Sequence, residues 1–235
     1  MSHPRSPIDA SPFTLVHAPD QGQVRWDELF GNDQPVELEI GSGKGLFLQN
    51  QATLHPDRNY LGIEISRKYA RKAAERVAKH GLTNVRVWAG DARPFLAACV
   101  PPESLAAAHV YFPDPWWKAR HKKRRVFTES LLRDLQAGLR DGGSLRVATD
   151  VEEYFQVIRD LIGAFPGFVP TPVEENLAPR NDLDYLTNFE RKYRIEGRPI
   201  FRFDARLRRD LIPAADLARD VQRTRPPSRD ADASS

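Results

Sequence analysis

Short apolar segments alternate with amphipathic segments over most of the chain, and this alternation restricts the possible folds more than any other feature of the sequence. Strands that alternate with helices form parallel βαβ units, so we expect an α/β fold with a doubly wound, mostly parallel sheet. An apolar run such as 105–112 is typical of a central strand covered on both faces. The predicted strands are 36–40, 60–65, 85–89, 105–112 and 144–148, followed by 167–172 and 199–203.

The segments between these strands have the apolar spacing of helices. Segment 66–80 repeats small apolar residues at i, i+3, i+4 and i+7 from Ala70, with Ser66 as its predicted N-cap. Segment 151–162 has the clearest apolar stripe. The other predicted helices are 44–54, 127–139 and 188–193.

The length of 235 residues and a hydrophobic content of 40% predict one main domain, at 26–204. Residues 1–25 are predicted to form a flexible N-terminal arm, and 205–235 a C-terminal extension whose last part is disordered. Cys99 is the single cysteine, so no internal disulfide is possible. The sequence shows neither an apolar signal region nor a membrane-spanning run, which predicts a cytoplasmic protein without a membrane partner.

Positive charge is concentrated rather than abundant. The formal net charge is only +3, yet six of the eight residues at 118–125 are Lys or Arg. A second arginine cluster lies at 202–209. Either cluster alone is compatible with an ordinary solvated surface, but clustered charge favours a polyanionic partner.

Ligands of doubly wound sheets bind at the carboxyl ends of the strands, so the residues after each predicted strand are the candidate site. Glu39 ends the first strand and precedes the glycine turn of Gly41 and Gly43. The spacing fits neither a P-loop nor a dinucleotide fingerprint. A carboxylate here suits S-adenosylmethionine, which carries an ammonium and a sulfonium but no phosphate. For the glycines alone, an ordinary strand-to-helix turn is an equally good interpretation.

Two more acids follow the next two strands. Glu64 can accept hydrogen bonds from both ribose hydroxyls, a device that nicotinamide enzymes share. Asp91 can accept the adenine amino group. Each acid alone is as readily a turn residue or a helix cap, but acids after three consecutive strands favour a cofactor site.

The turn after the fourth strand, at 112–118, is the most unusual segment. Two prolines fix the backbone around Asp114, and the adjacent tryptophans 116 and 117 are able to stack on a base or to pack under a helix. Asp114 is therefore the best candidate for substrate chemistry. Asp150 follows the fifth strand, with Glu153 three residues on, so a helix N-cap is a strong interpretation there, and it is compatible with a substrate contact because a cap carboxylate keeps spare acceptor sites.

These motifs, in this order, closely resemble the bacterial tRNA (guanine-N7-)-methyltransferase family. The glycine turn is generic to methyltransferases, whereas the motif at 112–125 and the Thr-x-Phe-Glu segment at 187–190 are specific. The residues that carry the resemblance are EIGSGKG (39–45), GIEI (62–65), GDA (90–92), FPDPWWKARHKKRR (112–125), ATD (148–150) and TNFERKYRIEGRPI (187–200).

The resemblance implies a seven-stranded, Rossmann-like class I methyltransferase fold that takes S-adenosylmethionine as cofactor. It implies transfer of a methyl group to N7 of guanine 46 in the variable loop of tRNA, with Asp114 as the catalytic residue. It requires neither a metal nor an obligate protein partner, and leaves monomer and dimer open. The implied cofactor contacts are Glu39, Gly41, Gly43, Glu64, Asp91 and Asp114. The implied contacts to the substrate nucleotide are Lys118, Asp150, Thr187, Asn188, Phe189 and Glu190. The implied contacts to the RNA backbone are Arg120, His121, Lys122, Lys123, Arg124 and Arg125.

The chain departs from the family's pattern at both ends. Residues 1–25 lack the basic arm that many members carry, and Phe201-Arg-Phe203 replaces an Asp-Leu pair. Three other functions compete with this interpretation: a methyltransferase for protein or DNA, a nicotinamide-dependent oxidoreductase, and a tRNA-binding protein without catalysis. The basic run at 118–125 argues against the first, the glycine spacing against the second, and the full set of strand-end acids against the third.

Overall fold

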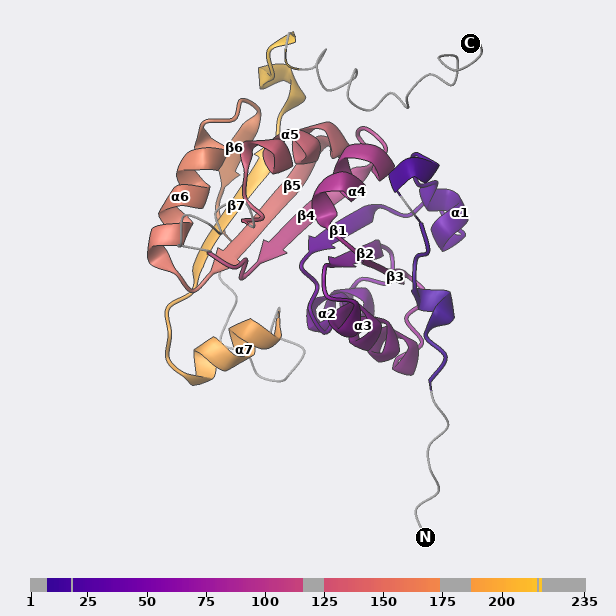
Figure 1. The fold of residues 1–235 in the computed structure, drawn as a ribbon. Coiled ribbons are helices and arrows are strands. Elements are labelled where there is room, and N and C mark those ends of the chain that lie inside the picture. The colour runs from indigo at the N-terminus through magenta and orange to yellow at the C-terminus, as the bar shows by residue number, and fades with distance from the viewer. Residues whose placement is uncertain (1–7, 18, 116–124, 174–186, 215, 217–235) are drawn as a thin grey trace, which may run out of the picture.

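The protein forms one sheet with helices on both faces (Figure 1). The computed structural model describes residues 8–17, 19–115, 125–173, 187–214 and 216. The strand order is β3-β2-β1-β4-β5-β7-β6. The strands are β1 (Val36–Ile40), β2 (Asn59–Glu64), β3 (Val85–Ala89), β4 (Leu105–Tyr111), β5 (Leu139–Thr149), β6 (Phe168–Thr171) and β7 (Phe201–Leu207).

The prediction of a doubly wound, mostly parallel seven-stranded sheet is confirmed. Strands β1 to β5 pair in parallel, while β7 lies antiparallel between β5 and β6. The central place predicted for 105–112 is also confirmed, because β4 lies between β1 and β5. Two strands are longer than predicted: β5 begins at Leu139, before its glycine pair, and β7 continues to Leu207.

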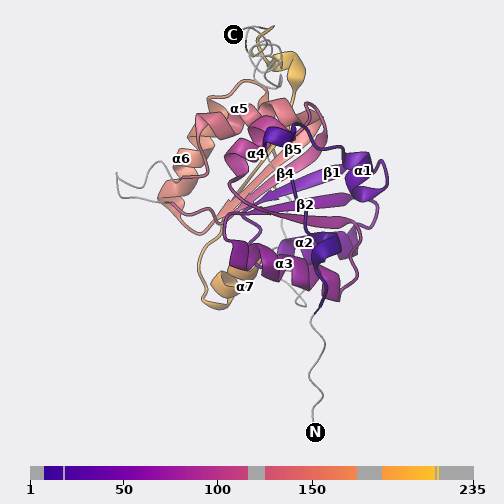
Figure 2. The same cartoon turned by 45° about the vertical axis from the view of Figure 1, so that its right-hand side comes forward.

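Helices on the two faces produce two apolar layers. One layer joins α2 and α3 to the sheet, and the other joins α4, α5 and α6 to it. Figures 1 and 2 show α7 beyond the carboxyl ends of β4 and β5, on the same side of the sheet as α2 and α3. The helices are α1 (Trp26–Phe30), α2 (Leu46–Leu54), α3 (Arg67–Lys79), α4 (Ala92–Cys99), α5 (Glu129–Gly138), α6 (Glu152–Gly163) and α7 (Asn188–Ile195), with short 3-10 turns at Ser11–Phe13, Pro19–Gln21 and Arg209–Leu211.

Two of these helices, α1 and α4, were not predicted from the sequence. Asp91 is the N-cap of helix α4, and its side chain accepts a hydrogen bond from the backbone N–H of Arg93. Pro94 lies in the first turn, where its missing N–H has no intrahelical partner to lose. With only eight residues, the helix is too short to show an apolar period in the sequence. In the structure, the cap fixes its start, and the buried side chains of Phe95 and Leu96 pack it against the sheet.

Part of the N-terminal segment docks on the main sheet. The N–H of Leu15 donates to the carbonyl of Val87, and the indole of Trp88 donates to the carbonyl of His17. Further on, the N–H of Val24 donates to the carbonyl of Cys99. Within the described part of the chain, no helix is both long and apolar enough to span a membrane.

Candidate functional site

The turn after β1 is held open by backbone geometry. Gly41, Gly43 and Gly45 all have positive φ angles, a region that residues with a Cβ rarely adopt. The N–H groups of Gly41 and Ser42 both donate to the carbonyl of Ile63, at 2.8 and 3.0 Å. These bonds fix the turn to the end of β2, so the ends of β1 and β2 form one rigid edge.

Glu39 is a buried acid without a partner at this edge. Its side chain is 2% exposed, and its Oε2 atom has no hydrogen-bond partner among the described residues. Burial, and then the nearby charge of Glu64, raise the pKa of this carboxyl well above its usual range. A buried carboxylate without a partner is costly, and a cationic ligand would remove that cost.

Glu64 closes the same edge from β2. Its two oxygens accept hydrogen bonds from the N–H groups of Gly43 and Ser66, each at 2.8 Å. A carboxylate has about four acceptor sites, so each oxygen keeps one for a ligand hydroxyl. Ile65, the next residue, is 72% exposed. An apolar side chain that is exposed beside a buried acid is suited to covering a flat ligand ring, and sequence reasoning missed it.

Asp91 follows β3 and is already engaged. Its carboxylate caps α4 and pairs with the Arg93 side chain at 2.5 Å. The hydrogen bond from Arg93 is the main cause that lowers the pKa of Asp91. The carboxylate is therefore ionised and keeps the role of an acceptor, so its predicted contact with an adenine amino group stays a prediction.

Together these residues fit S-adenosylmethionine. Glu39 offers an unpartnered carboxyl whose charged form an ammonium would stabilise, and Glu64 keeps free acceptor sites for the ribose hydroxyls. The glycine turn approaches without side chains, because a Cβ on Gly41 or Gly43 would meet nothing within 4 Å and the space there is open. Among the described residues, no group of three or more His, Cys, Asp or Glu side chains is arranged to hold a metal ion.

The turn after β4 carries Asp114 on a constrained backbone. Phe112 has a φ of 51°, which is unusual for an aromatic residue. Its N–H donates to the carbonyl of Ala148 at 2.7 Å, and its ring lies against the rings of Phe189 and Tyr193. Strained conformations persist where the surroundings hold them, often at functional sites. Asp114 itself is exposed, two residues beyond this anchor.

Arg125 holds the far end of the same loop. Its Nε donates to the carbonyl of Pro115 at 2.8 Å, and its guanidinium lies 5.5 Å from the centre of the Tyr154 ring. The structure therefore gives Arg125 a structural contact in addition to its predicted contact with RNA. The predicted substrate and RNA residues Lys118, Arg120, His121, Lys122, Lys123 and Arg124 lie outside the described residues.

Asp150, after β5, does not cap the following helix. The N-cap of α6 is Val151, and Asp150 instead pairs with Arg198 from the segment after α7. The guanidinium of Arg198 also lies 4.1 Å from the centre of the Tyr193 ring. The N-cap interpretation of Asp150 was wrong, because an arginine 48 residues away takes the carboxylate.

The Thr-x-Phe-Glu segment is built around the start of α7. Thr187 caps the helix by accepting the N–H of Glu190 at 3.0 Å. Glu190 is fully buried, and its Oε1 accepts from Arg194 at 2.8 Å and from Arg202 at 2.5 Å. Asn188 is the first residue of α7, and Phe189 is 52% exposed. Of these four predicted substrate residues, Phe189 therefore has the most accessible side chain whose surroundings are described.

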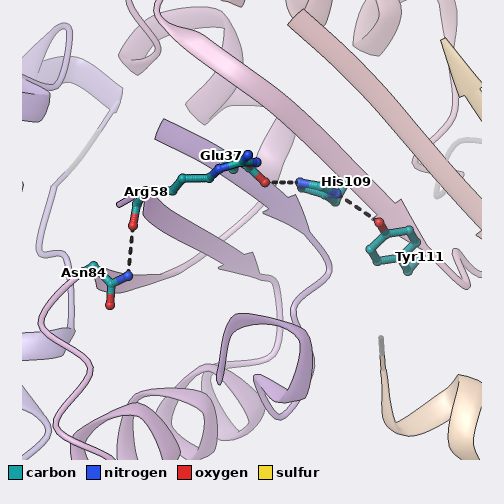
Figure 3. A network of polar contacts seen from close by, with 5 residues as sticks. All are labelled: Glu37, Arg58, Asn84, His109 and Tyr111. Atoms are coloured by element: carbon teal, nitrogen blue, oxygen red, sulfur yellow. Dashed lines mark hydrogen bonds and ion pairs between the residues drawn. The ribbon is translucent and has the colours of Figure 1, made fainter. Parts of the chain in front are cut away.

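A buried polar chain runs beneath the site, and the sequence analysis did not single it out (Figure 3). Glu37 pairs with Arg58 at 2.5 Å and with His109 at 2.8 Å, and the other nitrogen of His109 meets the Tyr111 hydroxyl at 3.0 Å. Burial alone would raise the pKa of Glu37, but the bonds from His109 and Arg58 outweigh it and lower that pKa to about 2. Burial lowers the pKa of His109.

The lowered pKa values of Glu37 and His109 show where the protons of this buried network lie. A neutral His109 donates from Nε2 to the Glu37 carboxylate and accepts the Tyr111 hydroxyl at Nδ1. The network thus fixes the carboxyl end of β4, where the turn at Phe112 begins. A glutamate inside the predicted strand 36–40 and a histidine inside the apolar run 105–112 were the signals that could have revealed it.

Solved structures confirm the class of fold. The chain is similar to the 16S rRNA methyltransferase KamB, with a TM-score of 0.55 and 16% identity over 79% of this chain and 95% of that chain. It is also similar to the aminoglycoside resistance methyltransferase NpmB1, with a TM-score of 0.50 and 16% identity over 77% and 91%. These neighbours and the strand order show the Rossmann-like fold of class I methyltransferases.

The family follows from the sequence comparisons. Residues 33–203 match the family described as "Putative methyltransferase". The tRNA (guanine-N(7)-)-methyltransferase of Rhodopirellula baltica is 46% identical over 180 residues, which are 74% of this chain and 66% of that protein. The protein of the same name from Alcanivorax borkumensis is 36% identical over 173 residues, 74% of this chain and 72% of that protein. The chain belongs to the tRNA (guanine-N7-)-methyltransferase family.

Proposed function

We propose that the protein transfers a methyl group from S-adenosylmethionine to N7 of guanine in tRNA, at position 46 of the variable loop. The observation that carries the proposal is the pairing of two features at one edge of the sheet. A buried, unpartnered Glu39 lies at the carboxyl end of β1, and the constrained Asp114 turn follows the neighbouring strand β4. The names of the relatives supply the substrate class.

On the cofactor side, Glu39 would hold the ammonium, Glu64 the ribose hydroxyls and Asp91 the adenine amino group. When it is bound, S-adenosylmethionine supplies a methyl group on a sulfonium, and the lone pair of N7 forms the new bond to that carbon as the carbon–sulfur bond breaks. N7 carries its lone pair at neutral pH, so no residue of the chain has to remove a proton. The enzyme's main task is therefore to align the guanine.

Asp114 would stabilise the positive charge that develops on the purine, because a carboxylate near that charge lowers the energy of the transition state. It would also accept the N1 and N2 hydrogens of guanine, which adenine cannot offer in the same pattern. The rings of Phe112, Phe189 and Tyr193 form one cluster beside this turn, with centroid separations of 5.4 to 6.1 Å. The exposed Phe189 ring would offer a stacking surface to the base.

The remaining proposed contacts contribute to the affinity for tRNA. Lys118, Asp150, Thr187 and Asn188 would surround the substrate nucleotide, with Glu190 holding helix α7, at whose start Thr187 and Asn188 lie. Residues 120–125 would lie along the RNA backbone, where arginine and lysine neutralise phosphates without reading sequence.

The test is methylation of an unmodified tRNA transcript, followed by borohydride and aniline, which cleave the chain at 7-methylguanosine. The proposal predicts one cut, in the variable loop, that is lost when the guanine at position 46 is replaced by adenine. Asp114→Ala should reduce turnover by about 100- to 1,000-fold with unchanged affinity for S-adenosylmethionine. Methylation at another position would overturn the substrate assignment, and near-normal turnover of Asp114→Ala would overturn the catalytic role.

A further inference from the structure

The outer face of α3 carries a dense positive charge that the proposed function does not use. Helix α3 contains six Lys or Arg residues and one acid, Glu75. Five of the six cations are exposed, and we call them the α3 basic face: Arg67, Lys68, Arg71, Lys72 and Lys79. The opposite face is apolar and buried against the sheet.

The positions of these cations destabilise the helix itself. Arg67 and Lys68 lie in the first turn, where the helix dipole disfavours cations, and no acid lies there to offset them. Arg67 and Arg71, and likewise Lys68 and Lys72, are four residues apart, so like charges face each other. A solvated helix that served only its own fold would mix signs at these positions.

Little inside the protein neutralises these cations. Arg71 pairs with Glu75 at 2.8 Å, an exposed i, i+4 pair. Among the described residues, no hydrogen bond or ion pair holds the side chains of Arg67, Lys68, Lys72 or Lys79. Four exposed and uncompensated cations on one helix favour an external polyanion.

The position of α3 places this charge next to the site. The helix begins directly after β2, and its N-cap, Ser66, donates its N–H to the site carboxylate of Glu64. Lys44 of the glycine turn lies 5.9 Å from the centre of the Tyr69 ring, in the first turn of α3. Figure 2 shows α3 and α7 on the same side of the sheet.

We propose that the α3 basic face binds the phosphate backbone of the tRNA, at a contact separate from the target nucleotide. This inference rests on the proposed tRNA substrate and adds a second contact surface to it. The contact is electrostatic and independent of sequence, so it supplies affinity and orientation but no chemistry.

The test compares two double variants in binding of unmodified tRNA without S-adenosylmethionine, over a series of salt concentrations. Lys68→Gln/Lys72→Gln removes two charges of the α3 basic face and also relieves their mutual repulsion, so the helix should not be weakened. Arg140→Gln/Arg159→Gln is the matched control, because both arginines are exposed and lie on β5 and α6, away from α3.

The α3 variant should bind tRNA more weakly at low salt, and its plot of log K against log salt should be flatter by about 1.4 to 1.8 if each lysine neutralises one phosphate. The control should keep the slope of the unmodified protein, and both variants should keep its affinity for S-adenosylmethionine. An α3 variant with the unchanged slope would overturn this inference alone, provided that the unmodified protein methylates tRNA. A protein that neither binds nor methylates tRNA would overturn the proposed function together with it.

Discussion

The two halves of the site treat their carboxylates in opposite ways. On the side of β1 and β2, Glu39 is buried without a partner. On the side of β5 and α7, Asp150 pairs with Arg198, and Glu190 pairs with both Arg194 and Arg202. The first half leaves this carboxyl without an internal partner, whereas the second pairs these two acids with arginines.

This difference assigns ligand binding to the side of β1 and β2, and the positioning of α7 to the side of β5 and α7. Burial disfavours the charged form of Glu39, as its raised pKa shows, and a cationic ligand would stabilise that form, so this half is prepared for a cationic ligand. The paired acids gain nothing further from a ligand's charge, and their role is to fix α7 and the segment after it against the sheet. Variants on the two sides should therefore affect different properties.

The largest effect is expected from Glu190→Gln. The change leaves two arginines, 28% and 16% exposed, without the buried carboxylate that they share. Removing one partner of a buried ionic cluster leaves uncompensated charge, so we expect the free energy of unfolding to fall by about 3 kcal/mol. Chemical denaturation measures it. Lys192→Gln, which breaks an exposed i, i+4 pair on the same helix, is the control and should cost less than about 0.5 kcal/mol.

Glu39→Gln should act on the ligand rather than on the fold. Loss of the charge weakens the interaction with the ammonium, and we expect the affinity for S-adenosylmethionine to fall by about 10- to 100-fold. The free energy of unfolding should stay constant or rise, because Oε2 of this buried carboxyl has no hydrogen-bond partner among the described residues to lose. Calorimetric titration and thermal denaturation measure the two quantities, with the surface variant Glu75→Gln as control. A large loss of stability with unchanged affinity would reverse the assignment.

The buried chain of Glu37, His109 and Arg58 predicts sensitivity to acid. The pKa of Glu37 is about 2 in the folded protein, against an ordinary value of 4.5, so its contribution is complete above pH 4.5 and is lost as the pH falls toward 2. The lowered pKa of His109 also makes the folded protein less stable in acid, because the unfolded chain protonates this histidine at a higher pH than the folded protein does.

Glu37→Gln should therefore flatten the decline of stability below pH 4.5. The full shift is reduced by solvent screening, since Arg58 is 40% exposed, and we expect a difference of about 1 to 2 kcal/mol. Urea denaturation at several pH values measures it. Parallel pH curves for the variant and the unmodified protein would show that the network contributes no linked stability.

The smallest effect is expected from Arg198→Gln. The change frees Asp150 and removes the cation from the Tyr193 ring, but Arg198 is 41% exposed, so solvent weakens both contacts. We expect the KM for tRNA to rise about threefold, a change typical of contacts worth less than 1 kcal/mol, without a change in affinity for S-adenosylmethionine. Steady-state methylation measures it, and Glu196→Gln is the control because its contact with Arg198 is long, at 3.9 Å.

The sequence predicted the sheet and the strand-end acids well, because both follow from local patterns. Apolar runs fixed the strands, and the rule that ligands bind at carboxyl ends placed Glu39, Glu64 and Asp91 together. The partners of the acids were not predictable in this way. Arg198 reaches Asp150 across 48 residues, and Arg202 on β7 reaches Glu190 on α7.

The same limit explains the missed polar network. Glu37 and His109 lie on neighbouring strands that are 72 residues apart in the chain, so only the register of β1 and β4 brings them together. Helix α4 was missed for another reason, since its eight residues are too few to show a period. Local signals define elements, whereas pairing between elements needs the fold.

The most direct test of the division between the two halves is to measure both ligand affinities for both variants. Dissociation constants for S-adenosylmethionine and for unmodified tRNA are determined for Glu39→Gln and for Arg198→Gln. The account predicts that Glu39→Gln loses affinity for S-adenosylmethionine but keeps its affinity for tRNA, while Arg198→Gln shows the reverse with a smaller loss. If Glu39→Gln kept its affinity for S-adenosylmethionine, or if both variants lost both ligands alike, the division would be contradicted.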